Sequence, residues 1–332
     1  MRSLTNRRQF TKAIAATGFA CAIASSPART ANQPLKIGWL KIQDKNHTPG
    51  QLQAFVEALE QAGEKEGRTF VIVKKFADGD VKRLVPLAQE LMTEKVDVVL
   101  ATSQPAVDAS LKVTHSIPIV GRMTDDPVQS GAAKSLAAPG GNLTGVYSLL
   151  EEMTGKRLAL LQQAVPTLHK VGALLTPDRG ATAFWLAQAE QAAKGLNLEI
   201  YVMNVHSGDE LDGLFERAAA EGVDGLLAFR NPTVVTFDHR VAELAAKYRF
   251  PSIFDARDFV DAGAFMSYGP NLEAIFRRLA SDVHEIAKGR SSAELPIEQP
   301  TIFELVINAK LAQSIGLTIP SSVLVSADEL MQ

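Results

Sequence analysis

Three polar side chains follow one of the most apolar segments of this sequence. Residues 96–101 read Val-Asp-Val-Val-Leu-Ala, and Thr102, Ser103 and Gln104 come next, before Pro105. Ser103 or Gln104 suits the N-cap of a helix in which Pro105 would take the first position. Hydroxyl groups and the free N–H groups of a helix N-terminus bind anions, so this segment predicts a site for a carboxylate or phosphate-like group. An ordinary helix cap that contacts no ligand is the alternative interpretation.

A second set of polar residues follows residues 223–228, about 130 residues further along the chain. There Phe229, Arg230 and Asn231 precede Pro232. The planar guanidinium of Arg230 can hold a carboxylate through two parallel hydrogen bonds, and Phe229 at the strand end could contact a ligand. A salt bridge at the rim or between two lobes is an equally consistent interpretation of Arg230.

Carboxylates follow the next apolar run in each half of the chain. Asp125 and Asp255 are expected at the carboxyl ends of strands, where they could accept hydrogen bonds from a ligand ammonium group. Asp126 and Asp258 are expected to cap the helices that follow. The remaining candidate ligand contacts at strand ends are Gln43, Asp44, Thr176 and Arg257.

The sequence contains no arrangement typical of an enzyme or of a metal site. Its six histidines never take the spacing of metal ligands, and neither a Gly-x-Ser-x-Gly motif nor a phosphate-binding loop occurs. No set of residues combines a nucleophile with a base. We therefore expect no catalytic residues, no metal ion and no cofactor.

Three landmarks that would position these side chains occur twice, in the same order and with nearly constant offsets. Residues 36–40 resemble residues 170–174, residues 96–101 resemble residues 223–228, and the Ile-Pro pair at 117–118 is echoed by the Phe-Pro pair at 250–251. Three collinear matches indicate two halves of similar architecture, with a cleft between them.

Short apolar runs alternate with longer amphipathic ones along both halves. Strands are expected at 35–41, 69–76, 96–101, 117–121, 143–147, 170–175, 197–203, 223–229 and 251–254. Helices are expected at 50–64, 80–94, from about 105, from about 127, and at 150–164, 181–194, 208–220, 233–248 and 271–288. This rhythm predicts an α/β fold of two doubly wound parallel-sheet lobes joined by hinge crossovers.

The first 31 residues are typical of an export signal. Arginines precede the weakly apolar stretch 13–27, and residues 7–12 resemble the twin-arginine pattern. Cleavage could follow either of two small-x-small sites, 22–24 or 26–28, and Cys21 lacks the leucine of a usual lipidation box. We therefore expect a periplasmic protein.

Composition excludes several classes of protein. The 332 residues are 46% hydrophobic and 21% charged, as in soluble globular proteins. Removing residues 1–31 leaves 29 bases and 37 acids, about −8, and takes away the one cysteine. An acidic chain is poorly suited to nucleic acid, and without thiols its stability must come from a large core.

Four further segments carry a resemblance to a known family. Residues 140–146 (GGNLTGV), 265–270 (FMSYGP), 303–308 (FELVIN) and 316–320 (GLTIP) resemble the TrpX-like substrate-binding proteins of ABC transporters. The resemblance extends from residue 35 to 330 and implies a type I periplasmic-binding fold. It also implies a small-molecule ligand, an amino acid or related carboxylate, because members with assigned ligands take amino acids, including aromatic ones. The loop at residues 43–47 matches no specificity pattern.

On this basis we expect a monomeric, non-enzymatic component of an ABC importer that passes its ligand to a permease in the inner membrane. A ligand sensor that reports to a membrane receptor kinase is the alternative function. The expected division is an export signal at 1–31, a first lobe of residues 32–145 plus 268–290, and a second lobe of residues 146–267 plus 291–332.

Overall fold

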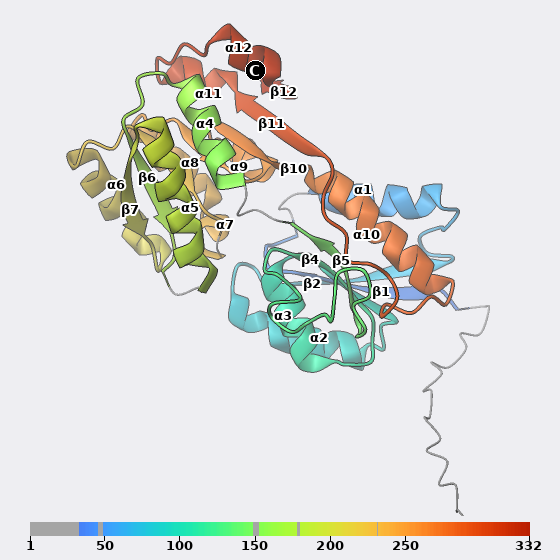
Figure 1. The fold of residues 1–332 in the computed structure, drawn as a ribbon. Helices are drawn as coiled ribbons and strands as arrows, with labels where there is room; N and C mark the ends of the chain where they lie inside the picture. Colours follow the sequence, from blue (N-terminus) through green and yellow to red (C-terminus); the bar gives the residue numbers. More distant parts are fainter. Residues whose placement is uncertain (1–32, 46–48, 149–152, 178–179, 231) are drawn as a thin grey trace, which may run out of the picture. The chain divides into compact units, whose positions relative to one another are not determined.

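The computed structural model describes residues 33–332 except 46–48, 149–152, 178–179 and 231. The expected export signal and the candidate ligand contact Asn231 therefore lie outside the described residues. The described part of the chain builds two sheets with helices on both faces, which is the predicted α/β class (Figure 1).

The first sheet has five parallel strands in the order β2-β1-β3-β4-β5. Its strands are β1 (Leu35–Lys41), β2 (Phe70–Phe76), β3 (Val98–Ala101), β4 (Ile119–Met123) and β5 (Leu143–Tyr147). Its helices are α1 (Pro49–Gln61), α2 (Leu84–Thr93), preceded by the 3-10 turn η1 (Val81–Arg83), and α3 (Gln104–Val113). Strands β3, β4 and β5 are buried along their whole length, as expected for a parallel sheet covered on both faces.

The second sheet repeats this order and adds two strands. The order β12-β11-β10-β9-β8-β6-β7 contains the same five-strand arrangement, and β11 pairs antiparallel with β10. The strands are β6 (Lys170–Leu175), β7 (Glu199–Asn204), β8 (Gly225–Ala228), β9 (Ser252–Phe254), β10 (Met266–Pro270), β11 (Phe303–Asn308) and β12 (Glu329–Met331). The repeated sequence landmarks fall on equivalent strands of the two sheets, which confirms the predicted duplication of architecture.

The helices of the second sheet lie on its two faces. They are α4 (Thr154–Ala164), α5 (Gly180–Leu196), η3 (Gly208–Glu210), α6 (Leu211–Ala220), α7 (Pro232–Thr236), α8 (Asp238–Lys247), α9 (Arg257–Asp261), α11 (Ala309–Ser314) and α12 (Ser321–Ser326). Helices α4 and α5 pack into one apolar core of this sheet, and α6 and α8 pack into the other. We call each sheet with its helices a lobe.

The long helix α10 (Leu272–Ala287) belongs to the first lobe although it follows the strands of the second. It packs beside α1, as Figure 1 shows, and Phe276 stacks on Trp39 with ring centroids 5.4 Å apart. Phe55 of α1 contacts the other side of the same indole edge-to-face at 5.8 Å. Trp39 is therefore a core residue, 1% exposed.

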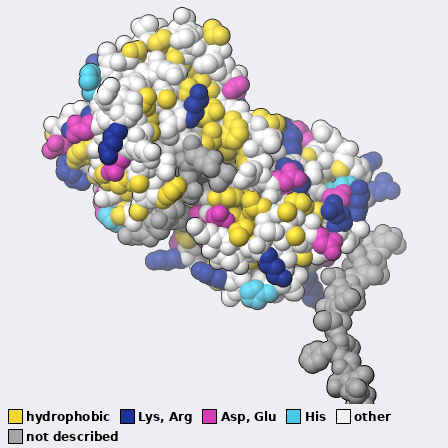
Figure 2. Space-filling model, in the orientation of Figure 1, with side chains coloured by type: hydrophobic (Ala, Val, Ile, Leu, Met, Phe, Trp, Pro, Cys, Tyr) yellow, Lys and Arg dark blue, Asp and Glu magenta, His cyan; other side chains and the backbone are white. Residues whose placement is uncertain are grey.

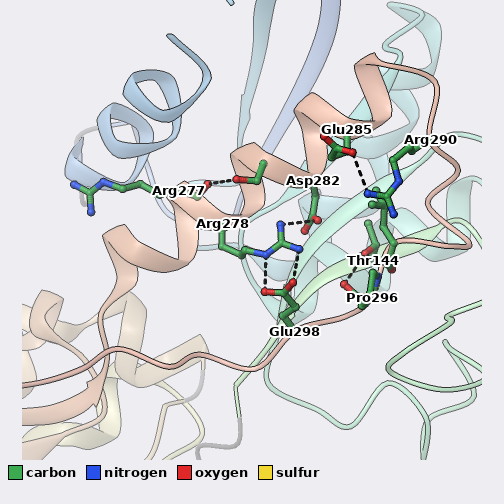
Figure 3. Close-up of polar contacts among 10 residues, drawn as sticks. Thr144, Arg277, Arg278, Asp282, Glu285, Arg290, Pro296 and Glu298 are labelled. Atoms are coloured by element: carbon green, nitrogen blue, oxygen red, sulfur yellow. Dashed lines mark hydrogen bonds and ion pairs between the residues drawn. The ribbon is translucent and has the colours of Figure 1, made fainter. Parts of the chain in front are cut away.

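The chain crosses between the lobes three times, so neither lobe is one continuous segment. The crossings follow β5, β10 and residue 298. After α10 the chain is fastened to the first lobe: the Thr144 hydroxyl donates to the Leu295 carbonyl at 2.8 Å, and Arg278 holds Glu298 by two hydrogen bonds of 2.6 and 2.8 Å (Figure 3).

The expected lobe boundaries differ from the strand positions at three places. Residues 146–147 complete β5, because its ladder with β4 runs to Tyr147. Residues 268–270 belong to β10, which pairs with β11 through Pro270. Residues 295–298 bind the first lobe as described above, instead of the second.

The helix expected from about residue 127 is absent from this segment, and a series of turns replaces it. The Asp126 carboxylate accepts hydrogen bonds from the backbone N–H groups of Val128 and Gln129, which forms a turn at the position where a cap was expected. Gly131 then takes a φ of 78°, which ends any helical path. The antiparallel strand β11 was not predicted either.

Charged groups of both signs are distributed over the protein surface. Figure 2 shows acidic and basic side chains interspersed among apolar ones on the face that it draws. No helix among the described residues is both long and apolar enough to cross a membrane.

Gly145 offers a direct test of close packing inside the first sheet. Its φ is +129°, and a Cβ atom at this position would lie 2.1 Å from the carbonyl oxygen of Gly121 on β4. We expect Gly145→Ala to lower the free energy of unfolding by about 3 kcal/mol, measured by urea denaturation. Gly141→Ala is the control, since its Cβ would meet nothing within 4 Å, and an equal loss in both variants would contradict this reading.

Asp282 offers a test of pH dependence. Burial raises its pKa to about 6, although Arg278, which donates to its Oδ1 at 2.8 Å, opposes the shift. Because the folded protein binds this proton more tightly than the unfolded chain, the stabilising contribution of Asp282 is complete below about pH 4 and is lost as pH rises through 6.

We therefore expect Asp282→Asn to gain stability relative to the parent protein between pH 4 and pH 7, by up to about 3 kcal/mol. Urea denaturation of both proteins at several pH values in this range measures the difference. A stability difference that stays constant with pH would contradict the raised pKa.

Candidate functional site

The strand order of each sheet marks a place where loops diverge. In an open α/β sheet, ligands bind at the carboxyl ends of the strands where the order reverses. In the first lobe this point lies between β1 and β3, and in the second lobe it lies between β6 and β8. The loops after these strands contain most of the residues singled out in the sequence.

A hollow with an empty volume of about 570 Å³ lies at these strand ends and has walls from both lobes. We call it the Arg122 pocket. It is lined by Ile42, Gln43, Gln51, Thr102, Ser103, Gln104, Pro105, Arg122, Thr124, Arg230, Val235 and Asp258. Five of the predicted contacts, Gln43, Thr102, Ser103, Gln104 and Arg230, are among these residues.

The three polar residues after β3 have different roles. Ser103 occupies the N-cap position of α3, but its hydroxyl caps nothing, and its buried Oγ has no hydrogen-bond partner among the described residues. The Thr102 hydroxyl donates to the Leu40 carbonyl at 3.1 Å. The Gln104 side chain accepts from the backbone N–H groups of Thr124 and Asp125 at 3.0 and 3.1 Å, so it positions the end of β4.

Arg122 places a buried positive charge in the wall of the Arg122 pocket. It lies in β4, is 6% exposed, and donates through Nε to the Thr102 carbonyl at 3.4 Å. It forms no ion pair with a carboxylate of the described residues. Burial, helped by repulsion from Arg230, lowers the pKa of Arg122 to about 10, so the side chain keeps its charge at neutral pH.

Arg230 joins the Arg122 pocket to a network of buried charges. Its Nε donates to Asp255 at 2.7 Å, its Nη2 donates to Asp258 at 2.8 Å, and its guanidinium lies 4.8 Å from the ring centroid of Phe259. Burial alone would lower the pKa of Arg230, but the two carboxylates outweigh burial and raise it. The guanidinium thus binds carboxylates of its own lobe, so it does not form the interlobe bridge that was the alternative interpretation. Its contact with a ligand carboxylate stays a prediction.

Lys41, at the end of β1, adds another buried cation near this network. Burial lowers its pKa to about 8, against the attraction of Asp258 and Asp44. Asp44 itself is exposed and does not line the Arg122 pocket.

A smaller hollow, with an empty volume of about 230 Å³, lies beside Arg230. We call it the Trp185 pocket. It is lined by Thr154, Arg157, Trp185, Phe229, Arg230 and Asp255. Its aromatic wall is a stack of Trp185 on Phe229, with ring centroids 5.9 Å apart and ring planes 9° apart. The predicted contacts Phe229 and Asp255 lie here, next to Arg230.

Three other predicted contacts line neither pocket. Asp125 is half-buried next to Thr124, whose hydroxyl donates to it at 3.4 Å. Thr176 accepts the Thr182 hydroxyl through its carbonyl, 2.9 Å away. Arg257 lines a different hollow together with Glu329 and Asp261, and it forms ion pairs with both of these residues.

The sequence analysis missed several residues of the two pockets. Arg122 was passed over, although a lone arginine inside an apolar strand is costly to bury and is a usable signal. Asp258 was expected to cap α9, but Ala256 occupies the N-cap and Asp258 pairs with Arg230. Arg157 and Thr154 carry no such signal, since they lie at ordinary positions of an amphipathic helix.

The described part of the chain contains no cluster of metal-ligating side chains. No group of three or more His, Cys, Asp or Glu side chains there could hold a metal ion. The two pockets instead offer guanidinium, hydroxyl and carboxylate groups, which can bind a small polar molecule without a metal.

Comparisons with known proteins match nearly the whole chain. The family model described as "ABC transporter substrate binding protein" matches residues 44–331. A curated relative, the tyrosine-binding protein of Clostridioides difficile, is 25% identical over 256 residues, which are 77% of this chain and 73% of the relative.

Solved structures resemble the fold over 90% of this chain. A conserved domain protein from Vibrio cholerae is 23% identical, with a TM-score of 0.79 and all of its chain covered. An ABC domain from Streptococcus pneumonia, in complex with L-Trp, is 22% identical, with a TM-score of 0.80 and again all of its chain covered. The fold is that of the type I periplasmic binding proteins, as predicted.

The Arg230 network can be tested by removing its cation. Arg230→Met would leave Asp255 and Asp258 buried without their partner, and we expect the free energy of unfolding to fall by about 3–5 kcal/mol. Arg240→Met is the control, because Arg240 pairs with Asp212 and Glu243 at the surface, and its loss should cost about 1 kcal/mol or less. Similar losses in both variants, measured by urea denaturation, would contradict a network held by Arg230.

Proposed function

Because this chain belongs to the family of ABC transporter substrate-binding proteins, we propose that it binds an amino acid or related carboxylate in the Arg122 pocket, between its lobes. In this proposal it is exported and passes the ligand to an ABC permease in the inner membrane. It acts as a monomer and catalyses no reaction.

The observation that carries the proposal is the buried charge of Arg122, which forms no ion pair among the described residues. Asp255 and Asp258 attract this charge, but the effect of burial is larger. A ligand carboxylate would offset the cost of burial through charge-assisted hydrogen bonds. The Oγ of Ser103, which has no hydrogen-bond partner in the described part of the chain, and the N-terminus of α3 line the same pocket, and both favour an anion.

The relatives narrow the chemical class of the ligand. The Clostridioides difficile relative is a tyrosine-binding protein, and the Streptococcus pneumonia structure holds L-Trp. Amino acids carry the carboxylate that Arg122 needs. They also carry an ammonium group, which suits Asp258 in the wall of the Arg122 pocket.

Both lobes contribute walls to the Arg122 pocket, and this division supports a closure mechanism. Gln43 and Ser103 come from the first lobe, whereas Val235 and Asp258 come from the second. A ligand that touches both lobes favours the arrangement in which they are close, because only differential contact shifts a conformational equilibrium. The closed form would then be the one that the permease recognises.

Arg122→Gln tests this proposal. We expect the variant to lose at least about 100-fold in affinity for the amino acid that the parent protein binds, measured by isothermal titration calorimetry. The ligand is found first by a thermal-shift screen of amino acids, in which a ligand at 100 times its Kd should stabilise the protein by about 2.7 kcal/mol.

The same variant should be at least as stable as the parent protein without ligand, because it removes a buried charge that forms no ion pair among the described residues. Arg217→Gln, at an exposed position of α6, is the control and should bind normally. Undiminished binding by Arg122→Gln would refute the placement of the carboxylate.

A further inference from the structure

Three buried polar atoms in the wall of the Trp185 pocket have no hydrogen-bond partner in the part of the chain that the structure describes. They are the Thr154 hydroxyl, the Trp185 indole N–H and Oδ1 of Asp255. Their residues are 1%, 6% and 3% exposed. Buried polar atoms are normally paired, and leaving one unpaired is costly, so three in the wall of one pocket point to a group that binds there.

The hydrogen-bonding capacity of these atoms restricts what that group can be. An indole N–H only donates, a carboxylate oxygen only accepts, and a threonine hydroxyl does either. A group that satisfies Trp185 and Asp255 together must accept one hydrogen bond and donate another. A hydroxyl or a primary amide does both, whereas an apolar group does neither.

The surrounding contacts hold these atoms in place. Trp185 is fixed by its stack on Phe229, and the other oxygen of Asp255 is fixed by Arg230 at 2.7 Å. The backbone of Asp255 is also confined, since a Cβ atom on Gly269 would lie 1.7 Å from the Asp255 carbonyl oxygen. Fixed polar atoms discriminate between ligands, because they cannot turn to other partners when the matching group is missing.

We propose that the Trp185 pocket is a specificity subsite that receives a hydroxyl or primary amide at the end of the ligand away from its carboxylate. This inference rests on the proposed function, in which Arg122 holds the carboxylate. Arg230 lines both pockets, so a ligand can reach from one to the other along its side chain. Indole-bearing and apolar ligand ends are disfavoured, because each leaves at least one of these buried atoms unpaired.

Two pairs of ligands that differ in this one property test the subsite by isothermal titration calorimetry. They are L-tyrosine with L-phenylalanine and L-glutamine with L-methionine. We expect the parent protein to prefer the hydroxyl or amide member of at least one pair by about 10-fold or more. Trp185→Phe keeps the aromatic stack, and Thr154→Val keeps the shape; each should reduce that preference by weakening only the hydroxyl or amide ligand.

Ser148→Ala is the matched control. Its hydroxyl is also buried, has no hydrogen-bond partner among the residues that the structure describes, and lines neither pocket, so the preference should persist. Equal binding within both pairs, with Arg122-dependent affinity intact, would overturn the subsite and leave the proposed function standing. An equal loss of affinity for all ligands in Trp185→Phe would also overturn the subsite. It would place the amino-acid head group, which all the ligands share, in the Trp185 pocket. Failure of every amino acid to bind would reject both the subsite and the proposed function.

Discussion

The burial of several positive charges at the strand ends is the constraint on which the rest of this structure depends. Arg230 is neutralised by Asp255 and Asp258, whereas Arg122 has no carboxylate partner among the described residues. A protein keeps such a charge only where the surrounding fold is stable enough to tolerate it. The two sheets provide that stability, because their central strands β3, β4 and β8 are buried along their whole length and hold the charged loops in place.

The duplicated strand order explains why the two pockets lie where they do. Each lobe has its own point of strand reversal, and each brings one set of polar loops to it. The first lobe supplies Ser103 and Arg122, and the second supplies Arg230 and its aspartates. The two halves therefore use the same architecture for different chemistry. The first lobe presents Arg122, which has no carboxylate partner among the described residues, and the second presents Arg230, which is paired with its aspartates.

Much of the fold could be predicted from sequence because periodicity and the repeated landmarks are local signals. The class, the doubled architecture and the core strands followed from them. The turns after Asp126 were not predictable from periodicity, since a carboxylate that binds two backbone N–H groups and a glycine with positive φ decided that segment. Pairing of β11 against β10 depends on contacts distant in sequence, which no local pattern records.

The candidate site was less predictable for a related reason. Residues directly after strands, such as Ser103 and Arg230, could be placed from the topology rule alone. The partner of Arg230 could not be predicted in this way. From the sequence alone, Asp258 is equally suited to cap a helix, and only the loop geometry decides between the two roles. Arg122 and Trp185 point into the pockets from inside a strand and a helix, and their direction depends on packing.

The position of α10 has a consequence for the folding of the protein during its synthesis. Trp39 of the first sheet and Phe55 of α1 pack in one apolar core with Phe276, which comes more than 200 residues later in the chain. During synthesis the earlier part of this core stays uncovered until nearly the whole polypeptide has left the ribosome, and exposed apolar surface invites aggregation. The first lobe therefore cannot complete this core until α10 has been synthesised.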